Sequence, residues 1–356
     1  MAIQFHDLKV SKIIRRTKDA VSVFFEIPDS LKDTYTYKPG QYITIKLDSI
    51  GINHRRAYSL STSPIADDDF GVTIKEVRAG KVSPWINNVL KVGQILEVMP
   101  PLGHFTTEIN EHNNKSYVFF AGGSGITPVI SLIKSILKVE KSSYCTLIYA
   151  NRNINSIIFK DELEELEKNN KNLKIVHIID EKDPEFQSEF GRLNNDKCKE
   201  ILSKTLTSST LYSSEFFLCG PSGLMQEIEL CLDKLQIEKK NIHKESFTVD
   251  EIETNKSTES SQPNKVRKVK VHIYGEEHTI DVRPDETILA AGIRQSLDPP
   301  FSCQIGACAT CQAKVLSGEV EMEAEDALME EDKIDGFILT CTSHPLTDDV
   351  EIDYDY

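Results

Sequence analysis

The chain has 356 residues, of which 39% are hydrophobic and 27% are charged, and its formal net charge is −15. This length indicates two or three domains, and the composition is typical of a globular protein rather than a disordered one. No apolar run approaches the roughly 18 residues that a membrane span needs, and the N-terminus lacks a basic-then-apolar signal pattern, so we expect a soluble, cytoplasmic protein.

The negative charge is unevenly distributed along the chain. Residues 270–356 contain 20 acidic and 5 basic side chains, whereas residues 1–269 contain 36 of each. This distribution argues against nucleic-acid binding, and it leaves two interpretations open. The acidic stretch either steers a basic protein partner onto this end of the chain or forms a solvated face that aids solubility.

The first 110 residues are predicted to be rich in β-strands. Short alternating runs at 21–27, 41–47 and 71–77 are separated by turns such as the one at Pro39-Gly40. Several strands at this spacing favour an antiparallel barrel or sandwich.

Residues 115–247 alternate between predicted strands and helices. A buried-strand run at 117–121 leads into a Gly-rich turn, and Thr127 and Pro128 suit the N-cap and the first position of a following helix. Further strands are predicted at 145–150, 173–179 and 216–219, and further helices at 160–168 and 222–235. This alternation predicts a parallel sheet covered by helices.

Residues 248–266 are polar, with few large apolar groups, which predicts a flexible linker. A small α+β domain is predicted after it. The domain would have a hairpin around Gly275, a helix at 286–297 and a closing strand at 350–354.

The cysteines carry the most specific pattern. Cys303, Cys308 and Cys311 form a C-x4-C-x2-C run, and Cys341 follows thirty residues after the last of them. This spacing matches the ligands of a plant-type [2Fe–2S] cluster, and Gly306 lets the loop backbone fold closely over it. The alternative is a structural zinc site, which usually has paired C-x2-C units or histidine ligands. The other cysteines stand singly, so no disulfide framework is expected: Cys145, Cys198, Cys219 and Cys231.

Two Gly-rich turns, at 122–128 and 219–223, each follow a strand and open a helix. Backbone N–H groups and the helix dipole at such a turn favour a pyrophosphate, although neither turn is the G-x-G-x-x-G fingerprint. Two of them at the carboxyl edge of one parallel sheet would form a cleft. Cys219 there either touches a nicotinamide or is a buried, inert cysteine.

A third segment, Arg55–Thr62, combines a cation, an aromatic ring and hydroxyls. Arg56 could pair with a phosphate bidentately, Tyr58 could stack on a flat heterocycle, and the Ser59 hydroxyl could donate to a ring nitrogen. An ordinary edge strand is the alternative.

Together, three segments resemble the ferredoxin–NADP reductase superfamily: Arg56-x-Tyr58-Ser59-x-x-Thr62, Gly122-Gly-x-Gly125-Ile-Thr127-Pro128 and Cys219-Gly220-Pro221-Ser222-Gly223. The C-terminal segment resembles a plant-type ferredoxin, and the fused order is similar to the reductase components of bacterial multicomponent oxygenases. Residues 301–304, 318–322 and 339–345 especially resemble the reductase subunits of ring-1,2-phenylacetyl-CoA epoxidases, and the reductases of steroid ring hydroxylases come next.

The resemblance implies a fold and an activity. It implies an FAD-binding antiparallel β-barrel at 1–110, an NAD(P)-binding α/β domain at 111–247, a linker at 248–266 and a β-grasp [2Fe–2S] ferredoxin domain at 267–356. A hydride would pass from NAD(P)H to FAD, and single electrons would then reach the cluster and a partner oxygenase with a basic docking surface, such as a phenylacetyl-CoA epoxidase. The alternatives are a reductase of another oxygenase, a diaphorase with other acceptors, and a non-catalytic metal-binding scaffold.

The resemblance also implies roles for single residues in binding FAD. Arg56 would bind the pyrophosphate, with Ala57 beside it. Tyr58 would pack on the isoalloxazine, and Ser59 would be a catalytic residue that hydrogen-bonds near N5. A turn would hold the pyrophosphate as well, through Lys81, Val82 and Ser83.

On the nicotinamide side, Cys219 would be the second catalytic residue, near C4 of the ring. Phe247 would cover the other flavin face, with a core phenylalanine as the alternative. The dinucleotide would be received by the two turns, through Gly122, Gly123, Gly125, Thr127, Gly220 and Pro221. The cluster ligands would be Cys303, Cys308, Cys311 and Cys341.

The choice between NADPH and NADH depends on the residues after the second strand of the nucleotide domain. An acidic residue there suits a ribose 2′-hydroxyl, whereas an arginine suits a 2′-phosphate. Arg152 occupies this region, so we predict NADPH, with NADH possible. The alternative is that Arg152 is a solvated loop cation.

Overall fold

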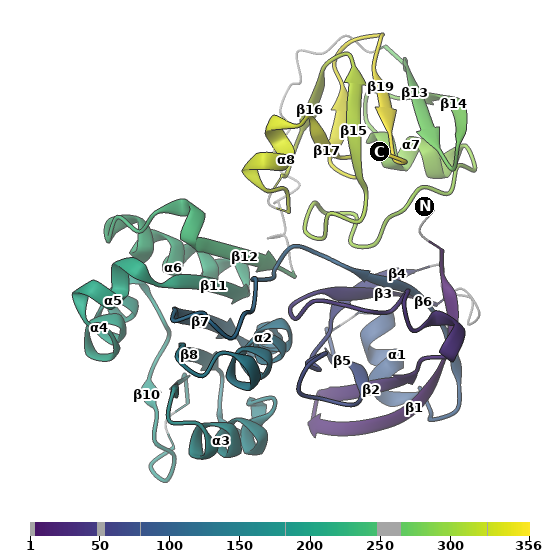
Figure 1. Cartoon of the computed structure of the whole chain (residues 1–356). Helices are drawn as coiled ribbons and strands as arrows, with labels where there is room; N and C mark the ends of the chain where they lie inside the picture. The colour runs from purple at the N-terminus through teal and green to yellow at the C-terminus, as the bar shows by residue number, and fades with distance from the viewer. Residues whose placement is uncertain (1–3, 48–53, 79, 182, 248–264, 326) are drawn as a thin grey trace. The chain divides into compact units, whose positions relative to one another are not determined.

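The computed structural model describes residues 4–47, 54–78, 80–181, 183–247, 265–325 and 327–356. They form two compact units, which are Phe5–Phe247 and a C-terminal unit that ends at Tyr356 (Figure 1). Each unit has hydrophobic clusters of its own. No helix within the described ranges is long and apolar enough to cross a membrane.

The first half of the larger unit is an antiparallel six-stranded sheet in the order β4-β3-β6-β1-β2-β5. A bridge between Leu60 and Val72 joins the two edges of this sheet, so it closes as the predicted barrel around one apolar core. The elements are β1 (His6–Thr17), β2 (Ala20–Glu26), η1 (Asp29–Leu31), β3 (Tyr42–Lys46), β4 (Arg55–Ser59), β5 (Phe70–Lys75), α1 (Val82–Asn88) and β6 (Ile95–Leu102).

The second half of this unit is a parallel six-stranded sheet in the order β10-β9-β8-β7-β11-β12. Its strands are β7 (Ser116–Gly122), β8 (Tyr144–Asn151), β9 (Leu173–Ile179), β10 (Glu189–Phe190), β11 (Glu215–Gly220) and β12 (Ile242–Ser246). Because both faces are covered, strand β7 is buried almost throughout, as its continuous apolar run predicts.

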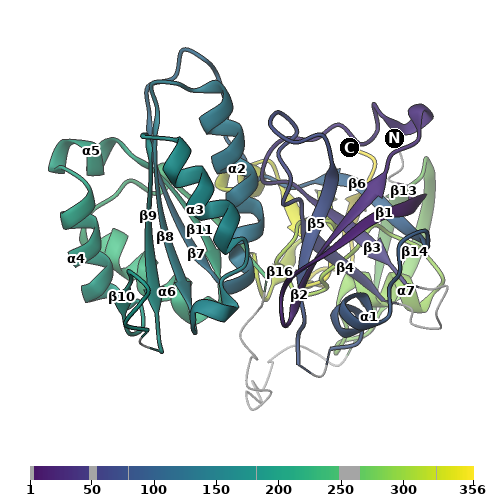
Figure 2. The same cartoon turned by 90° about the horizontal axis from the view of Figure 1, so that it is seen from below.

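Helices lie on both faces of the parallel sheet (Figure 2). Helices α2 (Ile126–Val139) and α3 (Lys160–Asn169) pack on one face, and α4 (Asn195–Thr205), α5 (Ser208–Ser213) and α6 (Ser222–Lys234) pack on the other. Short 3-10 turns complete the fold: η3 (Gly123–Gly125), η4 (Ile154–Ser156) and η5 (Lys239–Asn241). The predicted parallel sheet with covering helices is confirmed, whereas α1, α4, α5, β10 and β12 were not predicted.

The start of α2 corrects one prediction. The helix begins at Ile126 with Gly125 as its N-cap, so the expected N-cap at Thr127 and first position at Pro128 are wrong by two residues. The 3-10 turn η3 runs directly into the helix, and the Thr127 hydroxyl lies inside the first turn, where it donates to the Ser124 carbonyl at 3.1 Å.

Helix α2 also packs against the barrel through a buried polar seam, which consists of Thr62, Ser63, Ser131 and Ser135. The Ser131 hydroxyl donates to the Thr62 carbonyl at 2.6 Å, and the hydroxyls of Ser63 and Ser135 lie 2.7 Å apart. All four residues are at most 7% exposed. Since a buried polar group without a partner is costly, these bonds favour one arrangement of barrel and sheet.

The C-terminal unit contains a five-stranded sheet in the order β14-β13-β19-β15-β17 and a two-stranded sheet of β16 and β18. The predicted hairpin around Gly275 is confirmed. Helix α7 is shorter than predicted, because the Thr287 hydroxyl caps it by accepting from the Ala290 amide. The elements are β13 (Arg267–Ile273), β14 (Glu276–Val282), α7 (Ile288–Arg294), β15 (Gln312–Ser317), β16 (Val320–Met322), α8 (Glu330–Ile334), β17 (Phe337–Leu339), β18 (Ser343–Pro345) and β19 (Glu351–Asp353). Residues 248–264 of the predicted linker lie outside the described residues.

Candidate cofactor sites

Three strand ends meet where the barrel joins the parallel sheet. Ser59 ends β4, and Cys219 of β11 is paired in register with Glu245 of β12, so the last two side chains lie on one face of the sheet. The Ser59 hydroxyl donates to Oε2 of Glu245 at 3.0 Å. The structure therefore brings the two predicted catalytic residues to either side of a third residue, Glu245, which was not predicted.

Glu245 is a carboxyl group with an unusual protonation state. Burial raises its pKa to about 8, and the hydrogen bond from Ser59 opposes this shift only in part. The group is therefore mainly protonated at neutral pH and can hold or release a proton near that pH, as general acids and bases do. The only signal in the sequence is a glutamate two residues before Phe247, and its meaning depends on the pairing of β11 with β12.

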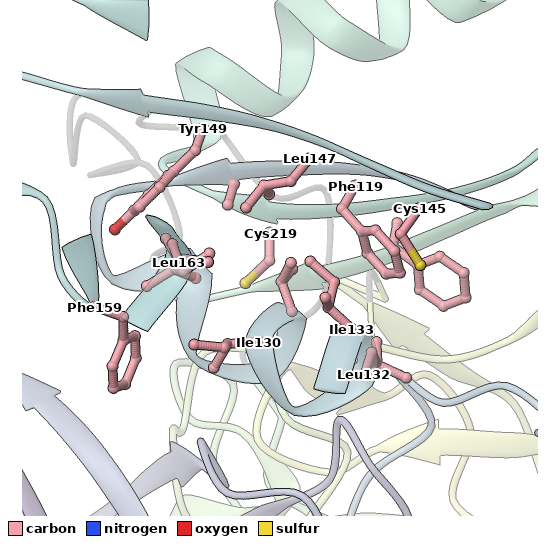
Figure 3. Close-up of a cluster of buried hydrophobic side chains, with 14 of the residues drawn as sticks. Phe119, Ile130, Leu132, Ile133, Cys145, Leu147, Tyr149, Phe159, Leu163 and Cys219 are labelled. Carbon is pink, nitrogen blue, oxygen red and sulfur yellow. The ribbon is translucent and has the colours of Figure 1, made fainter. Parts of the chain in front are cut away.

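The Cys219 thiol points into the hydrophobic cluster beneath α2 and is 1% exposed (Figure 3). Burial, together with the nearby carboxyl of Glu245, raises the pKa of this thiol well above its ordinary value. The thiol is therefore neutral, and its position favours the buried-cysteine interpretation. A contact with a nicotinamide stays a prediction.

The two Gly-rich turns lie backbone against backbone at the carboxyl edge of the sheet. A Cβ atom on Gly125 would overlap the carbonyl group of Cys219, and one on Gly122 would lie 2.8 Å from Cδ of Pro221. Only glycine allows this approach, which leaves the first amides of α2 and α6 at one edge, where a pyrophosphate would fit.

A cation that was not predicted lies beside the first turn. The Lys75 ammonium at the end of β5 would lie 3.7 Å from a Cβ atom on Gly123, and it also lies 3.7 Å from an Asp19 carboxylate oxygen. The chemistry of this turn, with its helix amides and a neighbouring cation, suits an anionic dinucleotide.

On the FAD side, Arg56 is exposed and Tyr58 is a neutral phenol, because burial raises the pKa of Tyr58. The predicted turn at 81–83 is the start of α1, with Lys81 as the N-cap. The Ser83 hydroxyl accepts from the Val77 amide at 3.0 Å, so it holds the preceding loop. The backbone amides of this turn, rather than that hydroxyl, are the groups that suit a phosphate.

Two more predicted residues lie in the expected strand-end positions. Phe247 follows β12 and is 37% exposed, so the core-phenylalanine alternative is wrong. Arg152 follows β8 and is exposed, and its carbonyl accepts from the Glu181 amide at 2.9 Å. A cation and a carboxylate therefore both lie at the strand ends where a ribose would be read, and NADPH stays a prediction.

The cysteine loop of the C-terminal unit has an unusual backbone. Gly306 has a φ of +76°, and a Cβ atom there would lie 3.0 Å from Cβ of Ala324. Gln304 and Ala309 also adopt positive φ angles, of 60° and 51°. Such conformations cost energy for residues with side chains, and they persist where a site requires them.

All four predicted cluster ligands come together in this loop. The Cys303 thiol contacts those of Cys308 and Cys341, which lower its pKa to about 3, and Cys341 also contacts Cys311. The Ala307 amide donates to the Cys303 sulfur at 3.3 Å. In the described part of the chain, no three His, Cys, Asp or Glu side chains surround a point for one ion. A [2Fe–2S] cluster has two irons with two thiolates each, and this arrangement fits it.

Three family models match the chain: an oxidoreductase FAD-binding domain at residues 7–107, an oxidoreductase NAD-binding domain at 119–229 and a 2Fe-2S iron-sulfur cluster binding domain at 271–346. Over 353 residues the chain is 35% identical to one subunit of the 1,2-phenylacetyl-CoA epoxidase of Escherichia coli (strain K12), covering 99% of this chain and 98% of that protein. The chain belongs to the family of oxygenase reductase components.

Other similar proteins agree with this family. The ferredoxin reductase component of a 3-ketosteroid-9-alpha-monooxygenase from Rhodococcus rhodochrous is 34% identical over 98% of this chain and 96% of its own length. Phthalate dioxygenase reductase has the same fold, with a TM-score of 0.60 and 21% identity over 98% of each chain. An intact type IV self-sufficient cytochrome P450 monooxygenase, of which this chain spans 41%, is also similar in fold, with a TM-score of 0.72 and 23% identity.

The chain is therefore an oxidoreductase that uses NAD(P)H, FAD and a [2Fe–2S] cluster, as the sequence predicts. When bound, these cofactors supply the transfer of electrons from the nicotinamide through the flavin to the cluster. The protein contributes binding, orientation and a proton-holding carboxyl at Glu245.

The close approach of the two turns gives a testable prediction. Gly125→Ala should push β11 away from the start of α2, and we expect KM for NAD(P)H in flavin reduction to rise by about tenfold or more. Gly223→Ala is the matched control in the second turn, since a Cβ atom there meets nothing within 4 Å. Equal KM values for the two variants would contradict this account of the turns.

The raised pKa of Glu245 gives a second prediction. Its folded pKa of about 8 lies above the ordinary 4.5, so the stability from its protonated form is complete below about pH 4.5 and is lost as the pH rises through about 8. Glu245→Gln stays neutral, so its melting temperature relative to the unsubstituted protein should increase from pH 5 to pH 9. Glu165→Gln, an exposed position on α3, should show no such trend. A pH-independent difference for Glu245→Gln would refute the assignment.

Proposed function

We propose that this reductase supplies electrons from NADPH to the oxygenase component of a phenylacetyl-CoA epoxidase. The observation that carries this proposal is the 35% identity, over almost the full length of both chains, to the Escherichia coli epoxidase protein. The second candidate is the reductase of a steroid ring monooxygenase, because the identity to the Rhodococcus rhodochrous reductase component is only slightly lower.

The proposed division of labour follows the domain limits expected from the sequence: FAD on residues 1–110, NADPH on 111–247, a linker at 248–266 and the cluster on 267–356. Ser59 and Glu245 would orient the flavin and hold a proton beside it, since their hydrogen bond lies at the junction of barrel and sheet. Arg56, Ala57 and Tyr58 would hold FAD, together with the turn at Lys81, Val82 and Ser83.

For NADPH we propose the two Gly-rich turns, assisted by the unpredicted Lys75, and Arg152 for the 2′-phosphate. Phe247 would cover the flavin, and its exposure is compatible with that role. The four cluster ligands are Cys303, Cys308, Cys311 and Cys341. The partner would present a basic surface to the acidic C-terminal unit, and a cytoplasmic location remains a proposal from composition.

Reconstitution tests the function. The Escherichia coli epoxidase, without the protein that this chain resembles, would be combined with this reductase, NADPH and phenylacetyl-CoA, and epoxide formation would be followed by mass spectrometry. We expect epoxide formation coupled to NADPH oxidation, and none with a Cys341→Ser variant. A parallel assay with the oxygenase of the Rhodococcus rhodochrous monooxygenase and a 3-ketosteroid tests the second candidate, and product only in that assay would refute the first.

The nucleotide preference is tested separately at Arg152. A charge-assisted hydrogen bond to a phosphate contributes about 1.5–3 kcal/mol, so Arg152→Ala should raise KM for NADPH by roughly tenfold to a hundredfold. KM for NADH should change little. The control is Lys171→Ala, which removes an exposed cation between α3 and β9. A KM for NADPH that is unchanged in Arg152→Ala would refute this role.

A further inference from the structure

An exposed apolar group lies at the C-terminal end of helix α8. Ile334, the last residue of α8, is 83% exposed, and Tyr356 is 59% exposed. The ring of Tyr356 contacts that of Phe337 edge to face, with 4.6 Å between the ring centroids. We call Ile334, Phe337 and Tyr356 the α8 patch. Single exposed apolar residues are common, so the argument depends on what lies beneath and around this patch.

The patch is joined to the cluster loop by continuous apolar packing. Phe337 begins β17, next to α8 (Figure 1), and packs against a hydrophobic cluster that includes the ligands Cys311 and Cys341. Leu339, at the other end of β17, is fully buried in the same cluster. Electron transfer slows steeply with distance, so a partner on the α8 patch would lie over a packed route to the thiolates.

The surroundings of the patch are acidic. Glu331, Asp332 and Asp335 lie on α8 and in the turn after it, and Asp332 is close enough to Tyr356 to help raise the pKa of that phenol. Lys333 on the same helix is paired with Glu325 at 2.8 Å. An apolar centre with a charged rim is the usual anatomy of a protein–protein interface.

The charge of the chain indicates which kind of partner fits. Residues 270–356 carry a net charge of −15, whereas residues 1–269 are neutral overall. A neutral surface gains little from an acidic rim, but a basic protein is steered towards it and held in register. A separate basic protein therefore complements the α8 patch better than the flavin-binding part of the same chain.

We propose that the α8 patch and its acidic rim form the docking surface for the electron-accepting oxygenase component, with Ile334 as the apolar anchor. This inference rests on the proposed function for the nature of the partner. The partner surface is basic, with an apolar recess for Ile334 and the Phe337–Tyr356 ring pair between its redox centre and the cluster.

The test uses a double variant, Ile334→Ala with Tyr356→Ser, in the full-length holoprotein. Its matched control is Ile293→Ala, an exposed isoleucine on α7 of the same unit. Three rates are measured: reduction of flavin and cluster by NADPH in stopped flow, turnover with ferricyanide, and turnover with a protein acceptor. The acceptors are the Escherichia coli epoxidase oxygenase component and cytochrome c, a basic haem protein.

We expect KM for both protein acceptors to rise about tenfold in the double variant, with cluster reduction and ferricyanide turnover unchanged. The control variant should match the unsubstituted protein, and KM for protein acceptors should rise with salt. Unchanged KM values in the double variant would overturn the proposal. Slower reduction of the cluster by NADPH would also overturn it, because the patch would then dock the flavin-binding unit. If the epoxidase accepts no electrons from the unsubstituted protein while cytochrome c shows the tenfold effect, the proposed function fails and the docking surface stands.

Discussion

The contact between helix α2 and the barrel is the constraint on which the flavin and nicotinamide sites depend. Ser59 and Glu245 are 186 residues apart and come from different sheets, and they meet only if barrel and parallel sheet keep one arrangement. The buried polar seam provides that constraint, because moving α2 would leave hydroxyls and a carbonyl without partners. At its border the Lys134 ammonium binds Asp67 of the barrel at 2.6 Å while only 13% exposed.

Within that arrangement, burial does most of the chemical tuning. Glu245 and Cys219 face each other in register, and the low-polarity surroundings keep both neutral at physiological pH. A neutral carboxyl with a hydroxyl beside it can exchange a proton where a charged one would repel electrons. The thiol acts by packing, and its carbonyl gives Gly125 the surface on which the two phosphate turns meet.

The C-terminal unit follows a different logic, because it must receive and release electrons rather than bind a large cofactor. Its strained loop collects four thiols, and backbone amides such as that of Ala307 donate to the sulfurs. Hydrogen bonds of this kind tune the reduction potential of a cluster. The acidic surface then becomes meaningful, because charge acts over longer distances than packing and can orient a partner before contact.

Local patterns predicted much of this protein. The cysteine spacing, the Gly-rich turns and the alternation of strands and helices identified the cofactors and the three folds, because each depends on residues close together in sequence. Helix boundaries such as Gly125 were missed where a 3-10 turn continued into the helix. Glu245, Lys75 and the α8 patch required the tertiary structure, since their meaning arises from neighbours far away in the chain. The sequence by itself determined which cofactors this protein can hold, through short-range backbone and ligand geometry. Only the tertiary structure decided which proton, charge and surface lie beside them, because burial and register are properties of the folded whole.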